Sequence, residues 1–237
     1  MDDFNRKRLE QEKLSDDEVD ILYDIMEVTD KILNEHDISY ILEGGSLLGA
    51  CRCGGLMPHD NDGDFDVLES DIPKIESLAN EFAKYDMVII KTPGWGLQIS
   101  HKDSPDLEPN MWTDGISYWT SKWPFLDLIT IKKSDDGSKY ILAGDVAQHD
   151  YPNYYLTLED WEGPRAKIQF GHLMLWSMFD ENNRIAYLDR HYPGWQTHIE
   201  MIMDHRANIY FDTPIHCDVT HSDQCYRHKR NNSSIIN

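Results

Sequence analysis

The stretch LEGGSLLGACRCGGLMPHDNDGDFDVLES, residues 42–70, joins a Gly-Gly-Ser turn to aspartates at every second position. Side chains of an extended segment alternate between two faces, so we expect the aspartates on one face and Phe65 and Val67 on the other, in the core. Neighbouring carboxylates disfavour each other's ionisation unless a positive charge compensates them. The run is either a solvated acidic loop or the site of a divalent cation such as Mg²⁺. The aspartates concerned are Asp60, Asp62, Asp64 and Asp66.

A calcium loop of the EF-hand type is a second explanation for these acids. Gly63 and Glu69 fit the end of such a loop, but Pro58 then stands at the first ligand position. Proline has no side-chain oxygen, and the flanking sequence is typical of strands rather than of paired helices. The EF-hand pattern therefore fails at its first ligand.

A further carboxylate, Asp127, lies inside the apolar segment PFLDLITI, residues 124–131. A buried, unpaired carboxylate costs several kcal/mol, so we expect Asp127 to have a partner or a metal. If this strand lies beside the aspartate run, two strands supply acids to one site. Such a site can hold one or two metal ions on a phosphate chain and align an attacking hydroxyl group.

The overall charge limits the classes of partner. The 237 residues carry 22 Lys and Arg against 43 Asp and Glu, a net charge of −21. Such a surface repels phosphate backbones, so we expect no nucleic-acid partner. No run of about 18 apolar residues and no signal peptide is present, which predicts a cytoplasmic protein without a membrane span. The four cysteines do not form a disulfide framework pattern, and Cys51 and Cys53 are expected to be ordinary buried thiols.

The order of elements predicts an α/β (α+β) fold, a mixed sheet flanked by helices with a loop-rich C-terminal extension. A capping box, Ser15 with Glu18, begins an amphipathic helix of about five turns. Ser70 is expected to cap a second helix that runs to Phe82. Residues 184–192 are expected to form a third helix, and most of the remaining chain after residue 140 is expected to form loops. Strands are predicted at 38–42, 63–68, 86–90, 96–100 and 124–133. We expect an N-terminal segment (1–14), one domain (15–200) and a C-terminal tail (201–237).

The Gly-Gly-Ser turn has a chemical interpretation of its own. Gly44 and Gly45 allow a tight turn, and Ser46 can begin a helix. Backbone amides at a helix N-terminus bind phosphate oxygens, and Arg52 is a candidate phosphate contact on an otherwise acidic face. Followed within about fifteen residues by alternating aspartates, the turn is the general signature of the nucleotidyltransferase superfamily.

The stretch YILEGGSLLGACRCGGLMPHDNDGDFDV, residues 40–67, resembles the signature of the LicD/fukutin family, most of all its fukutin-related branch. That signature reads Glu-Gly-Gly-Ser-Leu-Leu-Gly-Ala-x-Arg-His-Gly and then Pro-Trp-Asp-x-Asp-x-Asp. GLQIS and FLDL are similar to a later strand pair of the family, and YLDRHYPGW, residues 187–195, to a motif near the end of its domain. The chain departs from the signature at Cys53, His59 and Gly63.

The resemblance implies a nucleotidyltransferase fold that uses Mg²⁺ (or Mn²⁺). It implies transfer of a phospho-alditol or phosphocholine group from a CDP-linked donor, such as CDP-ribitol or CDP-choline, to a hydroxyl of a glycan or glycoconjugate acceptor, releasing CMP. Two alternatives remain: transfer of a nucleotide from an NTP with release of pyrophosphate, and a non-catalytic glycan- or metal-binding relative. The residues so assigned are Asp62, Asp64 and Asp127 as catalytic groups, the same three with Asp60 as metal ligands, and Gly45, Ser46 and Arg52 as donor contacts.

Two weaker patterns have a plain explanation beside a functional one. The segment HCDVTHSDQCYRH, residues 216–228, is either a zinc site or a polar tail. Trp112, Trp119 and Trp123 either stack on an acceptor sugar or pack under a loop.

Overall fold

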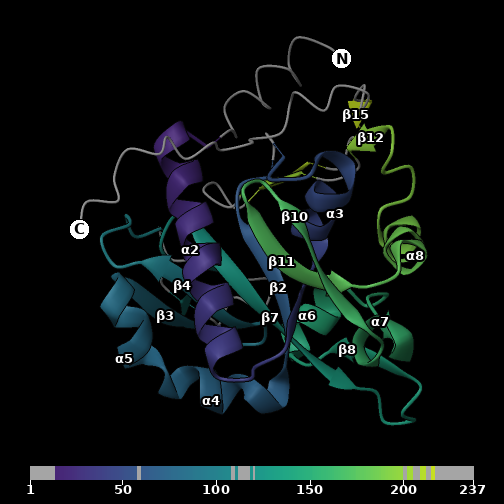
Figure 1. The fold of residues 1–237 in the computed structure, drawn as a ribbon, viewed down its shortest axis with the longest axis horizontal. Coiled ribbons are helices and arrows are strands. Elements are labelled where there is room, and N and C mark those ends of the chain that lie inside the picture. Colours follow the sequence, from purple (N-terminus) through teal and green to yellow (C-terminus); the bar gives the residue numbers. More distant parts are fainter. Residues whose placement is uncertain are drawn as a thin grey trace.

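A computed structural model describes the protein over residues 14–57, 60–107, 110–111, 118–119, 121–199, 202–204, 209–211 and 215–216. A mixed β-sheet lies at its centre (Figure 1), in the order β1-β2-β7-β4-β3, with β8 beside β7 and β9 beside β8. β2 and β7 are parallel and the other neighbours antiparallel, which confirms the predicted mixed sheet. The strands are β1 (Tyr40–Leu42), β2 (Gly63–Leu68), β3 (Met87–Thr92), β4 (Gly96–His101), β7 (Phe125–Lys133), β8 (Lys139–Leu142) and β9 (Leu156–Thr157).

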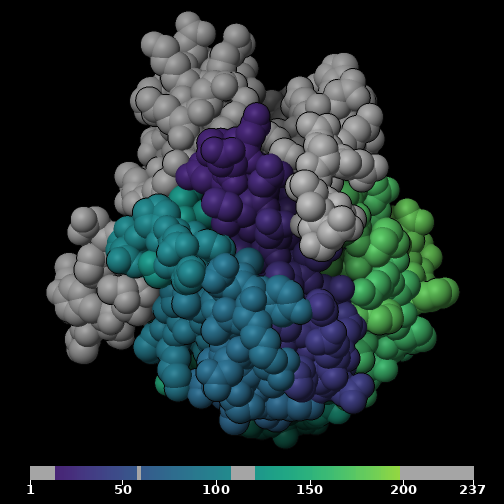
Figure 2. All heavy atoms as spheres, turned by 60° about the vertical axis from the view of Figure 1, so that its left-hand side comes forward, coloured from purple at the N-terminus to yellow at the C-terminus, as the bar shows by residue number. Residues whose placement is uncertain are grey.

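Helix α2 (Asp16–Glu35) crosses one face of the sheet and packs on β4 and β7. It begins at the predicted capping box: the Ser15 side chain accepts from the Glu18 amide, and the Glu18 carboxylate accepts from the Ser15 amide. Its apolar stripe, which includes Leu22 and Met26, is fully buried. The space-filling view shows the segment from α4 to β3 directly beside α2 (Figure 2).

The helix expected to begin at Ser70 is broken into pieces, so that prediction is wrong in detail. Ser70 lies in a 3₁₀ turn (Glu69–Asp71), followed by α4 (Ile72–Ser77), α5 (Ala79–Phe82) and a second 3₁₀ turn (Ala83–Tyr85). Pro73 is in the first turn of α4, where proline is favoured because it has no N–H to donate. The α-helix therefore starts at Ile72, and Ser70 does not cap it.

The chain after residue 140 contains more regular structure than the sequence predicts. β10 (Arg165–Phe170) and β11 (Leu173–Met178) form an antiparallel hairpin that packs on β1, flanked by α6 (Asp145–Asp150), α7 (Leu158–Glu162) and α8 (Glu181–His191). The hairpin turns at Gly171, whose positive φ of 61° suits glycine. The predicted third helix is confirmed, but the expectation of loops is wrong here: β10 reads RAKIQF, in which polar and apolar residues alternate as in a half-buried strand.

Short strand pairs complete the described chain: β5 (Asn110–Met111) with β6 (Tyr118–Trp119), β12 (His198–Ile199) with β15 (Ile215–His216), and β13 (Ile202–Asp204) with β14 (Ile209–Phe211). Cys51 is a free thiol but Cys53 is disulfide-bonded, so the expectation of ordinary thiols is wrong for Cys53. The partner of Cys53 lies outside the described residues, and cysteine spacing alone does not reveal a pairing. None of the described helices has the length and apolar character needed to cross a membrane. The domain boundaries and the cytoplasmic location stay predictions.

The two faces of β2 separate core from acids, as the alternation predicts. Phe65 and Val67 are fully buried, and the ring of Phe65 stacks on Tyr40 of β1 at 4.2 Å between centroids. The side chains of Asp64 and Asp66 therefore lie on the opposite face. The core under β2 fixes the strand that carries the acids.

Replacing Phe65 with alanine should lower the free energy of unfolding by about 3–5 kcal/mol, because it removes a buried ring and leaves a cavity beneath the acidic face. Urea unfolding followed by circular dichroism measures this change. Phe179→Ala is the matched control, since Phe179 is 64% exposed; its effect should stay within about 0.5 kcal/mol. Equal losses in the two variants would contradict the assignment of Phe65 to the core.

Candidate active site

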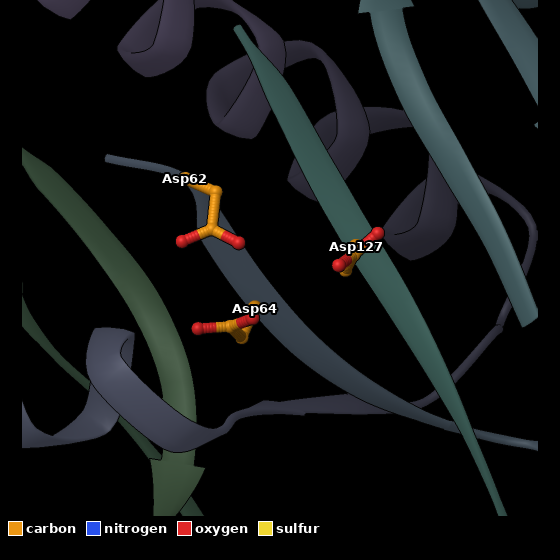
Figure 3. Close-up of side chains that lie close together, drawn as sticks. All are labelled: Asp62, Asp64 and Asp127. Carbon is orange, nitrogen blue, oxygen red and sulfur yellow. The ribbon is translucent and has the colours of Figure 1, made fainter. Parts of the chain in front are cut away.

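Three carboxylates meet where the parallel strands β2 and β7 run side by side. Asp64 of β2 is the direct neighbour of Asp127 of β7 in the strand register, and Asp62 lies immediately before β2. Each offers a carboxylate oxygen, and these oxygens all lie within 4.8 Å of one another (Figure 3). The expected proximity of the two acidic strands is therefore confirmed.

Burial and mutual repulsion hold protons on these acids. Burial raises the pKa of Asp64 to about 7 and, together with the charge of Asp64, that of Asp127 to about 8. The pKa of Asp62 is raised well above its usual range by burial and then by Asp64 and Asp60. Among the described residues, no lysine, arginine or histidine is a main influence on these pKa values. All three acids can ionise together only when a cation joins them, and their hard oxygens suit Mg²⁺.

Asp60 and Asp66 lie on either side of this trio. The Asp60 carboxylate is next to Gly45, at 2.6 Å from the point that a Cβ there would occupy, and its Oδ2 is buried without a hydrogen bond among the described residues. Asp66 accepts a hydrogen bond from the Tyr154 hydroxyl at 2.5 Å. Only Asp64 and Asp66 follow strand alternation, since β2 begins at residue 63. Of the four aspartates in the run, only Asp62 and Asp64 therefore belong to the group that converges with Asp127.

The start of α3 (Gly44–Cys53) orients Asp64. The backbone N–H groups of Gly45 and Ser46 donate to the Asp64 carboxylate, which lowers its pKa against the effect of burial. The fully buried Ser46 hydroxyl accepts from the Asp64 N–H at 2.9 Å. Gly44 has φ 49°, and a Cβ there would stand 3.2 Å from Asp64 Oδ2. The positive end of the helix dipole thus faces a carboxylate of the chain itself.

The other predicted donor contact, Arg52, lies away from the trio. It is seven residues after Gly45 on the same helix, about 10 Å along the axis, and its Nη1 is 3.6 Å from the Met57 sulfur. The structure does not bring Arg52 together with the carboxylates. Donor contacts of Gly45, Ser46 and Arg52 stay predictions.

Two polar residues to which the sequence analysis gave no role support Asp127. Gln98, directly opposite Asp127 on β4, donates a side-chain hydrogen bond to it that lowers its pKa. The Ser121 hydroxyl donates to the Gln98 carbonyl oxygen, which turns the amide nitrogen toward Asp127. Both residues are buried. The only signal in the sequence was a glutamine in an otherwise apolar strand.

A second group of polar residues lies beside the trio, and the sequence analysis gave no role to its acid, Glu43, or to the tyrosines that surround it. Glu43, the residue before α3, is buried and accepts from the Tyr187 hydroxyl at 2.7 Å. His191 stacks on Tyr154 at 5.3 Å and contacts Tyr187 at 4.5 Å between ring centroids. Burial raises the pKa of Glu43 well above its usual range, and the charges of Asp66 and Asp64 raise it further. α8 and the segment before α7 therefore supply hydroxyl donors to acids from the first third of the chain.

The weaker sequence patterns find little support. The buried Trp123 donates its indole N–H to Glu18 at 2.9 Å and packs edge-on against Phe125, so stacking of a sugar on Trp123 is excluded. Trp112, the Trp119 side chain and residues 217–228 of the zinc pattern lie outside what the structure describes.

Comparison with known proteins places this site in a family. The family model described as "LicD/FKTN/FKRP, nucleotidyltransferase domain" matches residues 37–177, which include the trio. An uncharacterized protein of Rickettsia prowazekii (strain Madrid E) is 23% identical over 190 residues, 80% of this chain and 60% of that protein. One of Rickettsia typhi (strain ATCC VR-144 / Wilmington) is 26% identical over 190 residues, 80% of this chain and 51% of that protein. The chain thus spans little more than half the length of these relatives.

Among solved structures, lincomycin-bound lincosamide antibiotic adenylyltransferase LnuA matches with a TM-score of 0.40 and 13% identity, over 77% of this chain and 89% of that one. ANT(2")-Ia in complex with adenylyl-2"-tobramycin matches with a TM-score of 0.36 and 12% identity, over 68% of each chain. With scores this far below 0.5, the likeness says nothing about what this chain binds.

The raised pKa values predict that the metal-free protein loses stability as the pH rises. Between about pH 4 and pH 8 the folded chain keeps protons on Asp64, Asp66 and Asp127 that the unfolded chain releases. Each such proton lowers the free energy of unfolding by ~1.4 kcal/mol per pH unit across this window. Urea midpoints of chelator-treated protein should therefore fall from about pH 5 to about pH 8.

A variant and added Mg²⁺ test whether the buried acids cause this pH dependence. Asp127→Asn should flatten the pH slope, and Mg²⁺ should stabilise the wild type more at the alkaline end, because the ligands must be deprotonated to bind it. Metal-free stability that is constant or rises across the window would contradict the protonated acids.

Gln98→Leu should weaken Mg²⁺ binding by about 10–100-fold, because the Asp127 carboxylate loses the donor that fixes its orientation. Isothermal titration calorimetry measures the affinity. Ser100→Ala, on the same strand, is the control: among the described residues the Ser100 hydroxyl donates to the Lys122 carbonyl alone, so its loss should leave the affinity within about twofold. If the two variants bind Mg²⁺ equally well, Gln98 does not orient Asp127.

Proposed function

This chain belongs to the LicD/FKTN/FKRP nucleotidyltransferase-domain family, and from that premise we propose that it is a metal-dependent phosphotransferase. It moves a phospho-alditol or phosphocholine group from a CDP-linked donor to a hydroxyl of a glycan or glycoconjugate, and releases CMP. The observation that carries the proposal is the trio Asp62, Asp64 and Asp127, within 4.8 Å on adjacent parallel strands.

The trio would hold Mg²⁺ or Mn²⁺, with Asp60 beside it as a further ligand. The fit rests on the chemistry of the donors: three oxygen ligands in reach of one another, a buried Asp60 oxygen without a partner, and no basic side chain among the main influences on the pKa values of the trio in the described chain. When bound, the ion supplies charge neutralisation on the donor diphosphate and a Lewis acid at the transferred phosphate.

The chain's own residues position these groups. The amides of Gly45 and Ser46 hold Asp64, and the Gln98 amide holds Asp127. Because these ligands are fixed before the donor arrives, little reorganisation is needed at the moment of transfer.

Asp127 is the proposed proton acceptor. The Gln98 amide holds its carboxylate in place, and a carboxylate oxygen that does not hold the cation would face the acceptor hydroxyl. The oxygen of the acceptor hydroxyl bonds to the transferred phosphorus, while the bond from that phosphorus to the CMP oxygen breaks and its electron pair leaves with CMP. The hydroxyl proton passes to the Asp127 carboxylate.

A second function uses the same residues. Attack on the α-phosphate of an NTP would transfer a nucleotide and release pyrophosphate, and the words "nucleotidyltransferase domain" in the family description favour keeping it as the alternative. The trio serves either reaction, since both need a cation on a phosphate chain and an aligned hydroxyl. The products distinguish them.

Product analysis with Mg²⁺, CDP-ribitol, CDP-choline and CTP tests both functions. We expect CMP from one CDP-linked donor, through slow hydrolysis even without the acceptor, and none when the metal is chelated. Asp64→Asn and Asp127→Asn should lower this release by more than ~100-fold, because each removes a ligand rather than a group that supports one. The exposed Asp135→Asn variant should match the wild type.

Pyrophosphate from CTP would favour the alternative. The absence of both products, and of any metal-dependent stabilisation by a donor, would leave a non-catalytic relative.

A further inference from the structure

Three tyrosine hydroxyls face the acids from the side of α8, and one of them differs from the other two. The hydroxyls of Tyr187 and Tyr154 are satisfied by Glu43 and Asp66. The Tyr192 hydroxyl has no hydrogen-bond partner among the described residues. Tyr192 is half-buried and its hydroxyl is not one of the enclosed polar atoms, so this hydroxyl is open to a ligand.

The Tyr192 hydroxyl also lies close to Asp64 of the trio. It lies 3.4 Å from the point where a Cβ on Gly44 would stand, and Asp64 Oδ2 lies 3.2 Å from that same point. The hydroxyl and the metal-ligating carboxylate therefore border one small region at the N-terminus of α3. A phosphate group that shares a cation with Asp64 would fall within reach of the hydroxyl.

The backbone holds Tyr192 firmly in this position. It is the C-cap of α8, where its N–H donates to Leu188 at 2.7 Å and its carbonyl accepts from Trp195 at 2.9 Å. The Trp195 indole N–H in turn donates to Asp189 at 2.9 Å. Because the backbone N–H and carbonyl of Tyr192 are both hydrogen-bonded, the side chain is positioned before a ligand binds. This positioning reduces the entropy lost on binding.

The charge of the site explains why a hydroxyl is needed there. A phosphate carries negative charge into a region lined by carboxylates, and the cation can contact only some of its oxygens. Lysine and arginine are absent from the main influences on the pKa values of the trio in the described chain. The amides of Gly45 and Ser46 are already bonded to Asp64. Tyr192 is a further neutral donor at this end of α3.

We propose that the Tyr192 hydroxyl donates a hydrogen bond to a phosphate oxygen of the nucleoside diphosphate donor, and is thus a substrate-contacting residue. The nature of the donor rests on the proposed function, whereas the phosphate contact rests on the geometry alone. The probes are therefore CDP and inorganic pyrophosphate, which test the contact without any turnover.

The experiment compares Tyr192→Phe with Tyr187→Phe, which removes the same atom from the hydroxyl that is satisfied by Glu43. Calorimetry of the Mg²⁺-loaded protein should show CDP and pyrophosphate bound about 5–10-fold more weakly by Tyr192→Phe, the loss expected for one hydrogen bond to a charged group. Its affinity for Mg²⁺ alone should stay within about twofold, and its unfolding midpoint should match the wild type. Tyr187→Phe should instead lower the unfolding midpoint, because it leaves Glu43 buried without its donor.

Each other outcome overturns the assignment. Equal binding of CDP and pyrophosphate by Tyr192→Phe and the wild type would show that the hydroxyl does not touch phosphate. An equal loss of affinity for cytidine would place the contact on the nucleoside. If the wild type binds neither CDP nor pyrophosphate, the protein has no phosphate ligand for Tyr192 to contact, and the proposal is wrong. If CDP-linked donors are not turned over, the proposed function fails, but the CDP comparison still decides the role of Tyr192.

Discussion

The hydrogen bonds from the first amides of α3 to the Asp64 carboxylate are the interaction on which the site depends. A carboxylate buried beside two others would otherwise be neutral or would disrupt the fold. The N-terminal amides carry the positive end of the helix dipole, so they partly compensate the charge without adding a basic side chain. Because α3 follows β1 after a single residue, Glu43, the strand order of the sheet places this helix end against β2.

The rest of the fold holds that arrangement from both sides. The register of β2 and β7 sets Asp127 beside Asp64, and β4, next to β7, supplies Gln98 behind Asp127. The hairpin β10–β11 packs on β1, and α8 follows it and brings Tyr187 to Glu43. Segments from the two halves of the chain therefore meet at the acids, and some of the groups that surround the site lie beyond the family match over residues 37–177.

The sequence predicted those features that local pattern determines. Alternation identified β2, β3, β4 and β7, the capping box identified α2, and an aspartate in an apolar strand identified Asp127. Alternation alone did not separate Asp62 and Asp64 from Asp60 and Asp66, because the point where the strand begins decides which acids converge. The family resemblance did name Asp62, Asp64 and Asp127 together. Glu43, Tyr154 and Tyr187 were given no role, since their partners lie about 90–140 residues away in sequence. The hairpin was missed although its first strand, RAKIQF, alternates polar and apolar residues.

The distribution of charge limits what the site can do. The acids of the trio repel a phosphate, and no basic side chain of the described chain is a main influence on their pKa values. Specificity for a phosphate compound would therefore come from a cation and from neutral donors. Neutral donors are directional, so they favour one orientation of the donor where a lysine would accept several. Which phosphorus faces the acceptor hydroxyl then follows from the side on which the nucleotide lies, while the trio stays the same. Under the proposed function, the hydroxyls and aromatic groups around the acids would decide between phosphotransfer and nucleotidyl transfer, and the Tyr192 hydroxyl beside Asp64 is one of them.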